Sequence, residues 1–133
     1  MTTHATATFE VKSWDEKPYH ESDGQLKLTR ASVSKAFHGD LEGESTLEYL
    51  MAYPGNGSAS FVGLEHVVGR LGDRSGSFVL QHSGSDDGHT ATGRWFVVPG
   101  SGTGGLRGLR GEGSFAASRG EQQFGFTLDY DFG

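Results

Sequence analysis

Hydrophobic and polar residues alternate with a period of two along most of this chain, a pattern typical of strands that bury one face. The clearest stretch lies near the C-terminus, where Phe124, Phe126 and Leu128 alternate with polar residues. Glycine-containing turns separate such stretches at intervals of about 8 to 12 residues, the spacing of β-sandwiches and β-barrels. The alternation therefore predicts eight strands, over residues 4–14, 25–37, 41–53, 59–70, 75–83, 90–98, 111–117 and 121–132.

The second and third predicted strands form a hairpin around Gly39-Asp40. We expect a register that places these residues face to face: Leu28 and Met51, Leu26 and Tyr53, Lys35 and Glu44. That register separates an apolar face from a charged one. A helix over residues 45–53 is the alternative, because the segment begins with a capping-box pattern, but it leaves the separation of faces unexplained.

The fourth and fifth predicted strands pair across Gly72-Asp73 and bring two titratable side chains together. This hairpin places Gly63 opposite His82 and sets Glu65 diagonal to His82. In apolar surroundings, desolvation shifts the pKa values of a carboxyl and an imidazole toward neutrality, so Glu65 and His82 are candidate acid–base residues. The alternatives are that this face points outward, or that the two groups only satisfy each other.

Apolar and aromatic residues that share faces with this pair are candidates for lining a ligand cavity. Arg30 shares its expected face with Tyr49, and an interior Arg30 needs a carboxylate such as Glu65 or Glu112. An arginine near a barrel end that reaches water is the alternative interpretation. The complete set of expected ligand-binding residues is Phe78, Leu80, Arg30, Tyr49 and Trp95.

A glycine-rich stretch, PGSGTGGLRGLRGEG over residues 99–113, precedes the last two predicted strands. Its Gly100-x-Gly102-x-x-Gly105 spacing resembles a dinucleotide fingerprint, but that motif requires a following helix within a βαβ unit, which the pattern does not provide. We expect a flexible loop or a short helical turn that crosses one end of a barrel.

Composition and charge narrow the function classes. Seventeen acidic and eleven basic side chains give a net charge of −6, which disfavours a nucleic acid partner. Cysteine is absent, and the six histidines show no metal-ligand spacing, so we expect no metal and no cofactor. The N-terminus lacks the pattern of a signal peptide and no run reaches membrane-spanning length; we expect a cytoplasmic protein without membrane contact.

Several motifs together resemble a bacterial family known as domain-of-unknown-function family 3224. They are Gly76-Ser77-Phe78-Val79-Leu80-Gln81-His82, Pro99-Gly100-Ser101-Gly102-Thr103-Gly104, Leu106-x-Gly108-Leu109-x-Gly111, Phe37-x-Gly39-Asp40-Leu41-x-Gly43 and Leu128-Asp129-Tyr130-Asp131-Phe132. The family is similar in fold to the allene oxide cyclase-like, lipocalin-like β-barrel, which implies eight antiparallel strands closed around a small cavity. Relatives of that barrel hold apolar, flexible substrates, but no cyclase motif aligns here residue by residue.

These observations predict one all-β domain over residues 1–133, an eight-stranded antiparallel closed barrel that binds a small apolar molecule in its cavity. One alternative is an isomerase or cyclase that steers a flexible apolar substrate and transfers a proton. A second is a filled structural barrel that acts through assembly. Because relatives of this barrel associate, we also expect a homo-oligomer.

Overall fold

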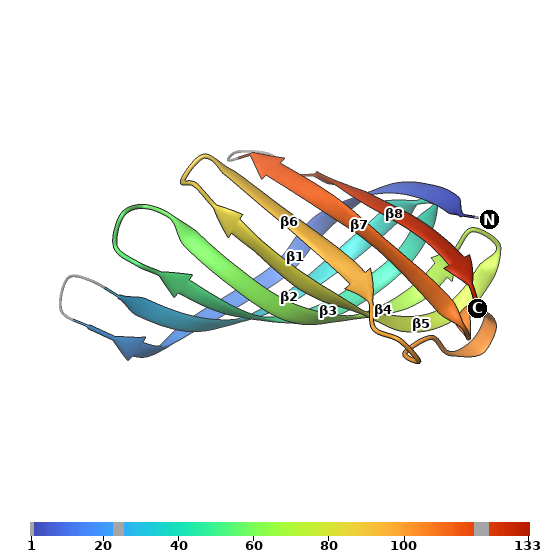
Figure 1. Cartoon of the computed structure of the whole chain (residues 1–133), viewed down its shortest axis with the longest axis horizontal. Helices are drawn as coiled ribbons and strands as arrows, with labels where there is room; N and C mark the ends of the chain where they lie inside the picture. Colours follow the sequence, from blue (N-terminus) through green and yellow to red (C-terminus); the bar gives the residue numbers. More distant parts are fainter. Residues whose placement is uncertain (1, 23–25, 119–122) are drawn as a thin grey trace.

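Eight antiparallel strands close into a barrel in the computed structural model, which describes residues 2–22, 26–118 and 123–133 (Figure 1). Each strand pairs with the next along the chain, and the last pairs back with the first. The strands are β1 (Thr3–Glu21), β2 (Lys27–Gly39), β3 (Leu41–Tyr53), β4 (Ala59–Leu71), β5 (Arg74–Asp86), β6 (Thr90–Val97), β7 (Leu109–Ser118) and β8 (Phe124–Phe132). The predicted closed barrel and its eight strands are confirmed.

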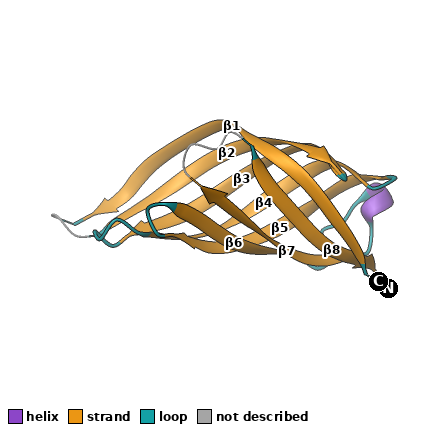
Figure 2. Cartoon of the chain, turned by 90° about the horizontal axis from the view of Figure 1, so that it is seen from above, coloured by secondary structure: helices purple, strands orange, loops and turns teal. Residues whose placement is uncertain are grey.

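One end of the barrel is closed by the glycine-rich segment. A single 3-10 turn, η1 (Gly104–Leu106), lies at the end where both chain termini lie and inserts the buried Leu106 (Figure 2). The turn lies close to β5 because Gly76 has no side chain: a Cβ there would lie 2.0 Å from the carbonyl oxygen of Thr103. The expected short turn is confirmed, and no described helix is long and apolar enough to cross a membrane.

The strands are staggered at the opposite end. β1 and β2 extend beyond β6, β7 and β8 (Figure 1). Among the described residues, β1 pairs with β8 from Thr3 to Phe9, whereas its pairing with β2 continues to Glu21 through two irregularities, at Val11/Ser13 and Pro18/His20. From Asp15 onward, the described pairing partner of β1 is β2 alone.

The predicted register of the β2–β3 hairpin is wrong by one residue. Lys35 lies opposite Ser45 instead of Glu44, and Thr29 instead of Leu28 lies opposite Met51. The cause is the turn: Gly39 adopts a φ of +125°, and Asp40 turns outward to accept a hydrogen bond from the Thr6 backbone at 2.9 Å. An odd number of residues therefore lies between paired positions of the two strands. The residues of β2 that point inward are consequently those that the predicted register placed on the charged face. The segment over residues 45–53 is strand, so the helix alternative is also wrong.

Side chains inside the barrel form three layers. An apolar cluster fills the η1 end and includes Phe37, Phe78 and Phe126. A second apolar cluster lies toward the staggered end and consists of Ala31, Val33, Leu47, Tyr49 and Phe61. Between these clusters lie the buried polar residues Lys35, Ser45, Glu65 and His82. Buried charged groups require partners, so this middle layer is the place to look for chemistry.

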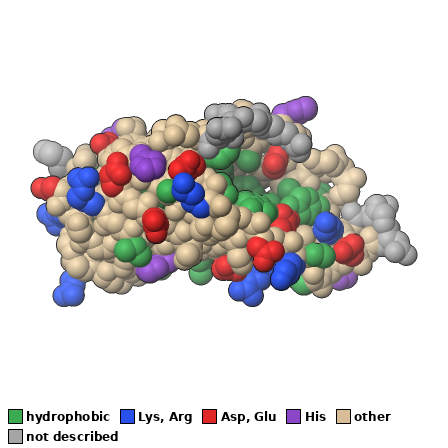
Figure 3. Space-filling model, turned by 180° about the vertical axis from the view of Figure 1, so that it is seen from behind, with side chains coloured by type: hydrophobic (Ala, Val, Ile, Leu, Met, Phe, Trp, Pro, Cys, Tyr) green, Lys and Arg blue, Asp and Glu red, His purple; other side chains and the backbone are tan. Residues whose placement is uncertain are grey.

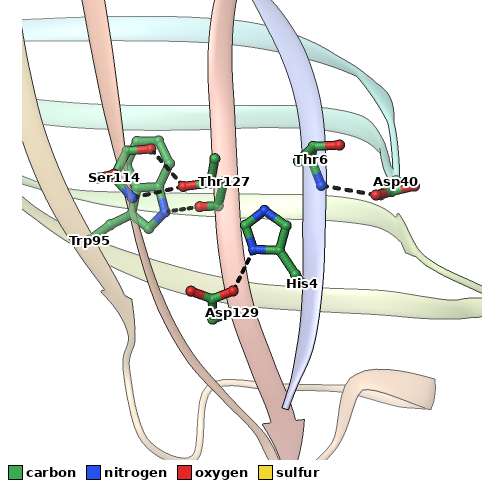
Figure 4. A network of polar contacts seen from close by, with 7 residues as sticks. All are labelled: His4, Thr6, Asp40, Trp95, Ser114, Thr127 and Asp129. Atoms are coloured by element: carbon green, nitrogen blue, oxygen red, sulfur yellow. Dashed lines mark hydrogen bonds and ion pairs between the residues drawn. The ribbon is translucent and has the colours of Figure 1, made fainter.

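A tryptophan lies across a neighbouring strand and ties three strands together. The Trp95 indole of β6 donates a hydrogen bond to the backbone oxygen of Thr127 on β8, at 3.0 Å (Figure 4). It crosses β7 at Gly113, where a Cβ would lie 2.6 Å from the indole nitrogen. The hydroxyl of Thr127 donates to the Ser114 backbone oxygen at 3.2 Å (Figure 4). Outside this network, His4 of β1 contacts Asp129 of β8 at 2.5 Å, which also links the barrel closure.

Candidate functional site

The polar layer is organised around the carboxylate of Glu65. Its Oε1 accepts a hydrogen bond from Nε2 of His82 at 2.7 Å, and its Oε2 accepts one from the hydroxyl of Ser45. The ammonium of Lys35 lies 3.6 Å from the same Oε2. These residues come from β2, β3, β4 and β5, and alternation on each strand turns them inward. Four neighbouring strands therefore each contribute one residue to a connected, buried cluster.

The predicted pairing of β4 with β5 is confirmed. Gly63 lies opposite His82 and Glu65 lies opposite Leu80, which makes Glu65 and His82 diagonal neighbours on the inner face. The turn from Leu71 to Arg74 contains an even number of residues, so the alternation of both strands stays in phase. Both side chains point into the barrel and contact each other, and neither lies on the outer surface.

Electrostatics fixes the charges of the cluster. Burial would raise the pKa of Glu65, but Lys35 and the hydrogen bonds from His82 and Ser45 outweigh it and lower that pKa to about 2. Burial lowers the pKa of His82 despite the opposing effect of Glu65, and Lys35 lowers it further. An ionised Glu65 beside a neutral His82 leaves Lys35 as the counter-ion. The negative charge of Glu65 and the positive charge of Lys35 therefore cancel, and the cluster has no net charge.

The imidazole of His82 is held in one tautomer. Because an ionised carboxylate only accepts, Nε2 must carry the hydrogen that it shares with Glu65. Nδ1 has no hydrogen-bond partner among the described residues, and the ring packs against Tyr49 and Trp95, with centroids 5.8 and 5.1 Å away. A second proton on Nδ1 would bury an unpaired N–H, which explains why His82 stays neutral.

An apolar cavity of about 170 Å³ adjoins the cluster on the side of the staggered end. Val11 and Trp14 at its rim are 38% and 46% exposed, so it opens to solvent beside β1. Figure 3, which views the molecule from the side opposite to Figure 1, shows hydrophobic side chains gathered in a hollow of the surface. The lining residues are Phe9, Val11, Trp14, Lys35, Tyr49, Met51, Phe61, Asp86, Ala91, Phe115, Ala117 and Phe124.

Aromatic rings form a continuous wall around this cavity. The Tyr49 ring lies 6.0 Å from Trp14 and 5.1 Å from Phe61, measured between centroids. On the other side, Phe115 lies 6.2 Å from Phe61 and 6.4 Å from Phe9. Such tilted and edge-on contacts are favourable for aromatic rings. The wall presents ring surfaces to any molecule that enters.

Glycines on adjacent strands make room for these rings. A Cβ at Gly93 would lie 2.4 Å from the ring of Phe115, and one at Gly63 would lie 2.8 Å from the ring of Tyr49. Each glycine is the register partner of the aromatic residue beside it. An aromatic side chain can thus lie flat over a neighbouring glycine instead of projecting into the barrel. This arrangement keeps space at the centre.

The expected ligand-binding residues lie in different parts of the barrel. Tyr49 lines the cavity. Phe78, Leu80 and Trp95 point inward and belong to the apolar cluster at the η1 end. None of them lines the cavity, although the Trp95 ring stacks on the lining residue Phe115, with centroids 5.3 Å apart. Arg30 lies on the outer face, with 66% of its side chain exposed, and donates a hydrogen bond to Glu48 at 2.9 Å. The expectation of an interior Arg30 is wrong because the β2–β3 register differs by one residue.

Glu65 and His82 are buried behind the cavity and do not line it. Lys35 is the charged group that joins the two regions, because it both faces the cavity and pairs with Glu65. Lys35 and Ser45 were not among the predicted site residues, and Lys35 was expected on the charged face opposite Glu44. The signal was present: in β2, Lys35 follows Ala31 and Val33 and precedes Phe37 at inward positions of the alternation. A charge within an apolar series of period two indicates a buried charge.

Metal binding has no visible site in the described ranges 2–22, 26–118 and 123–133. There, no group of three or more His, Asp or Glu side chains is arranged to hold an ion. The described wall of the cavity itself offers the amine of Lys35, the carboxylate of Asp86 and aromatic surfaces.

Comparison with known proteins identifies relatives of this barrel. The profile of a family described as protein of unknown function, DUF3224, matches residues 5–130. A crystal structure of a DUF3224 protein of unknown function from Shewanella oneidensis MR-1, at 1.84 Å resolution, is 36% identical, with a TM-score of 0.82 over 100% of this chain and 99% of that one. No curated protein matches the chain. The chain belongs to the DUF3224 family.

Proposed function

We propose that this protein binds a small, uncharged, mainly apolar molecule in the cavity, with one acceptor oxygen of the ligand directed at Lys35. The observation that carries the proposal is the combination of an aromatic-walled cavity of about 170 Å³ with one cation, Lys35, among the described residues of its wall. Ligand sites commonly combine apolar walls with a few polar groups that fix orientation.

Size and surface favour a ring-containing ligand. An apolar cavity of about 150 Å³ in another protein accommodates benzene. The present cavity, of about 170 Å³, has room for one aromatic ring and a short substituent, because it also opens beside Trp14. Edge and face contacts with the rings of Phe61 and Phe115 would stabilise such a ligand. An unfilled space of this kind favours binding over a purely structural barrel.

Charge favours an uncharged ligand over an acid. Lys35 already pairs with the carboxylate of Glu65 at 3.6 Å. A ligand carboxylate would add its negative charge to the carboxylates of Glu65 and Asp86 beside one described ammonium, and the excess charge would be costly in a poorly solvated site. A carbonyl or hydroxyl oxygen avoids this cost, because an ammonium carries three N–H donors and can accommodate a neutral acceptor beside its counter-ion.

The proposal is tested by ligand-induced stabilisation against thermal unfolding, with cinnamyl alcohol as the first probe in a panel of uncharged aromatic and aliphatic alcohols. A ligand that binds only the folded state at ten times its Kd stabilises by about 1.4 kcal/mol. We expect the variant Gly93→Ala to lose this shift, because a Cβ there displaces the Phe115 ring. The control Gly125→Ala should keep it, because nothing lies within 4 Å of that Cβ.

Two outcomes would contradict the proposal: no concentration-dependent shift with any member of the panel, or an equal shift in wild type and Gly93→Ala. Native mass spectrometry of protein purified from its own host adds an independent reading, because it detects a retained molecule and the assembly mass together. The cytoplasmic location and the homo-oligomer stay predictions. Light scattering that gave a monomer mass at every concentration would refute the oligomer.

A further inference from the structure

We propose that the cavity captures apolar aldehydes covalently, through an imine formed with the side-chain amine of Lys35. This inference rests on the proposed function and specifies its ligand class. It follows from the position of one particular lysine, from the carboxylate held beside it and from the apolar cavity in front of it.

Lys35 differs from the other lysines of the chain in its surroundings. The sequence contains four lysines, and the other three, Lys12, Lys17 and Lys27, are exposed. The Lys35 side chain is 4% exposed, and its Nζ lies 4.3 Å from the centroid of the Phe9 ring. Burial lowers the pKa of Lys35 against the opposing effect of Glu65, which increases the fraction of neutral amine. Desolvated lysines of this kind are the ones that form Schiff bases.

The charge balance of the reaction suits this site. The neutral amine adds to the carbonyl carbon and forms a C–N bond; the resulting carbinolamine loses water. The net change converts an ammonium and an aldehyde into a protonated imine and one water molecule, so no charge is gained or lost. Glu65, 3.6 Å from Nζ, neutralises the ammonium before the reaction and the iminium after it. Apolar walls keep bulk water away from the imine, which slows its hydrolysis.

The geometry also restricts the aldehyde. Its carbonyl must reach the inner end of the cavity at Lys35, while its apolar part lies between the rings of Phe61 and Phe115 toward the opening beside Trp14. A linear molecule with a terminal aldehyde satisfies this arrangement. A bulky ketone places a second substituent against the Phe9 ring, next to Nζ, so we expect aldehydes to react in preference to ketones.

The test uses the intact protein, trans-cinnamaldehyde as the probe and cyanoborohydride to trap the imine by reduction. Peptide mass mapping then locates the added cinnamyl group on the four lysines. We expect Lys35 to be modified about tenfold faster than the exposed lysines, as a desolvated amine in a binding site should be. Excess cinnamyl alcohol, which cannot form an imine, should suppress modification at Lys35 and leave Lys17 unaffected.

Matched variants complete the design. Lys35→Met should lose the fast adduct, and the control Lys17→Met should retain it, because the Lys17 side chain is 80% exposed. Equal labelling of all lysines overturns the inference, as does labelling of Lys35 that the alcohol does not suppress. If the alcohol stabilises the protein but no adduct forms at Lys35, covalent capture is refuted while reversible binding stands. If no alcohol of the panel stabilises it, the proposed function itself fails.

Discussion

Replacing Glu65 by glutamine should destabilise the fold severely, because this one carboxylate satisfies three buried partners. Glutamine keeps the shape of the side chain but removes its charge. The ammonium of Lys35 would then lie in the barrel interior without a counter-ion, since Glu65 is the acidic group within 4 Å of it among the described residues. The hydrogen bonds from His82 and Ser45 would also lose their charged acceptor.

The expected magnitude follows from this burial. Removing one partner of a buried, hydrogen-bonded ion pair costs about 3 to 5 kcal/mol. Domains are typically stable by only about 5 to 15 kcal/mol, so Glu65→Gln would remove a large fraction of the total. For a chain of this length, such a loss corresponds to a decrease in Tm of about 10 to 20 °C. In urea it corresponds to a decrease in the midpoint of about 2 M.

Urea denaturation at pH 7, followed by tryptophan fluorescence, measures this effect. The control is Glu48→Gln, because Glu48 also accepts hydrogen bonds from an arginine and a serine, but on the exposed outer face. Its loss should cost no more than about 1 kcal/mol. The double variant Lys35→Met/Glu65→Gln should be more stable than Glu65→Gln alone, because methionine removes the unpaired charge.

A cost for Glu65→Gln no larger than that for Glu48→Gln would refute the reasoning. So would strict additivity of the Lys35 and Glu65 substitutions, because it would show that the two charges do not interact. Either result would mean that water reaches the polar layer and screens the charges of Lys35 and Glu65 from each other.

Three further expectations concern acid, a hydroxyl and a close approach of strands. Acidification below pH 6.5 should destabilise the fold, first because the pKa of His82 is lowered in the folded state, and then below pH 4.5 because the pKa of Glu65 is lowered as well. Glu65 alone should account for about 3 kcal/mol of lost stability by pH 2. Urea denaturation across this pH range measures the loss, and a flat profile would refute the expectation. Ser45→Ala should cost about 1 to 3 kcal/mol in the same assay, whereas an unchanged midpoint would show that its hydroxyl is dispensable. Gly69→Ala should lower the Tm by at least about 10 °C, because its Cβ would lie 2.1 Å from the Glu42 backbone oxygen, and a Tm like that of Gly125→Ala would contradict this.

Sequence reasoning predicted the barrel because alternation and turn spacing are local properties of the chain. The eight strands and the η1 turn follow from them, and so does the β4–β5 hairpin, whose turn at Gly72-Asp73 leaves an even number of residues. The contact between Glu65 and His82 could be predicted for the same reason. Diagonal neighbours on one face follow directly once the register of a hairpin is correct.

The remainder of the site depends on contacts between distant segments. The β2–β3 register is set by Asp40, whose side chain bonds to Thr6 of β1, a residue far away in sequence. Because the observed register differs from the predicted one by one residue, Arg30 lies on the outer face and Lys35 lies in the interior. The cavity could not be predicted either, because its lining combines residues of strands that are far apart in the sequence, such as β1, β3 and β7.

The extension of β1 beyond β8 also creates a sheet edge, with consequences for self-association (Figure 1). In the described part of the chain, residues 15–21 of β1 pair only with β2, so their outer backbone groups are available to a strand of another molecule. This segment carries the charged side chains of Asp15, Glu16 and Lys17, followed by Pro18, which has no N–H to donate, and an irregularity at Pro18/His20. Charges, proline and bulges are devices that prevent edge-to-edge pairing and aggregation. The edge that leaves the cavity accessible is thus unsuited to extending the sheet between molecules, and a homo-oligomer would have to assemble through another face of the barrel.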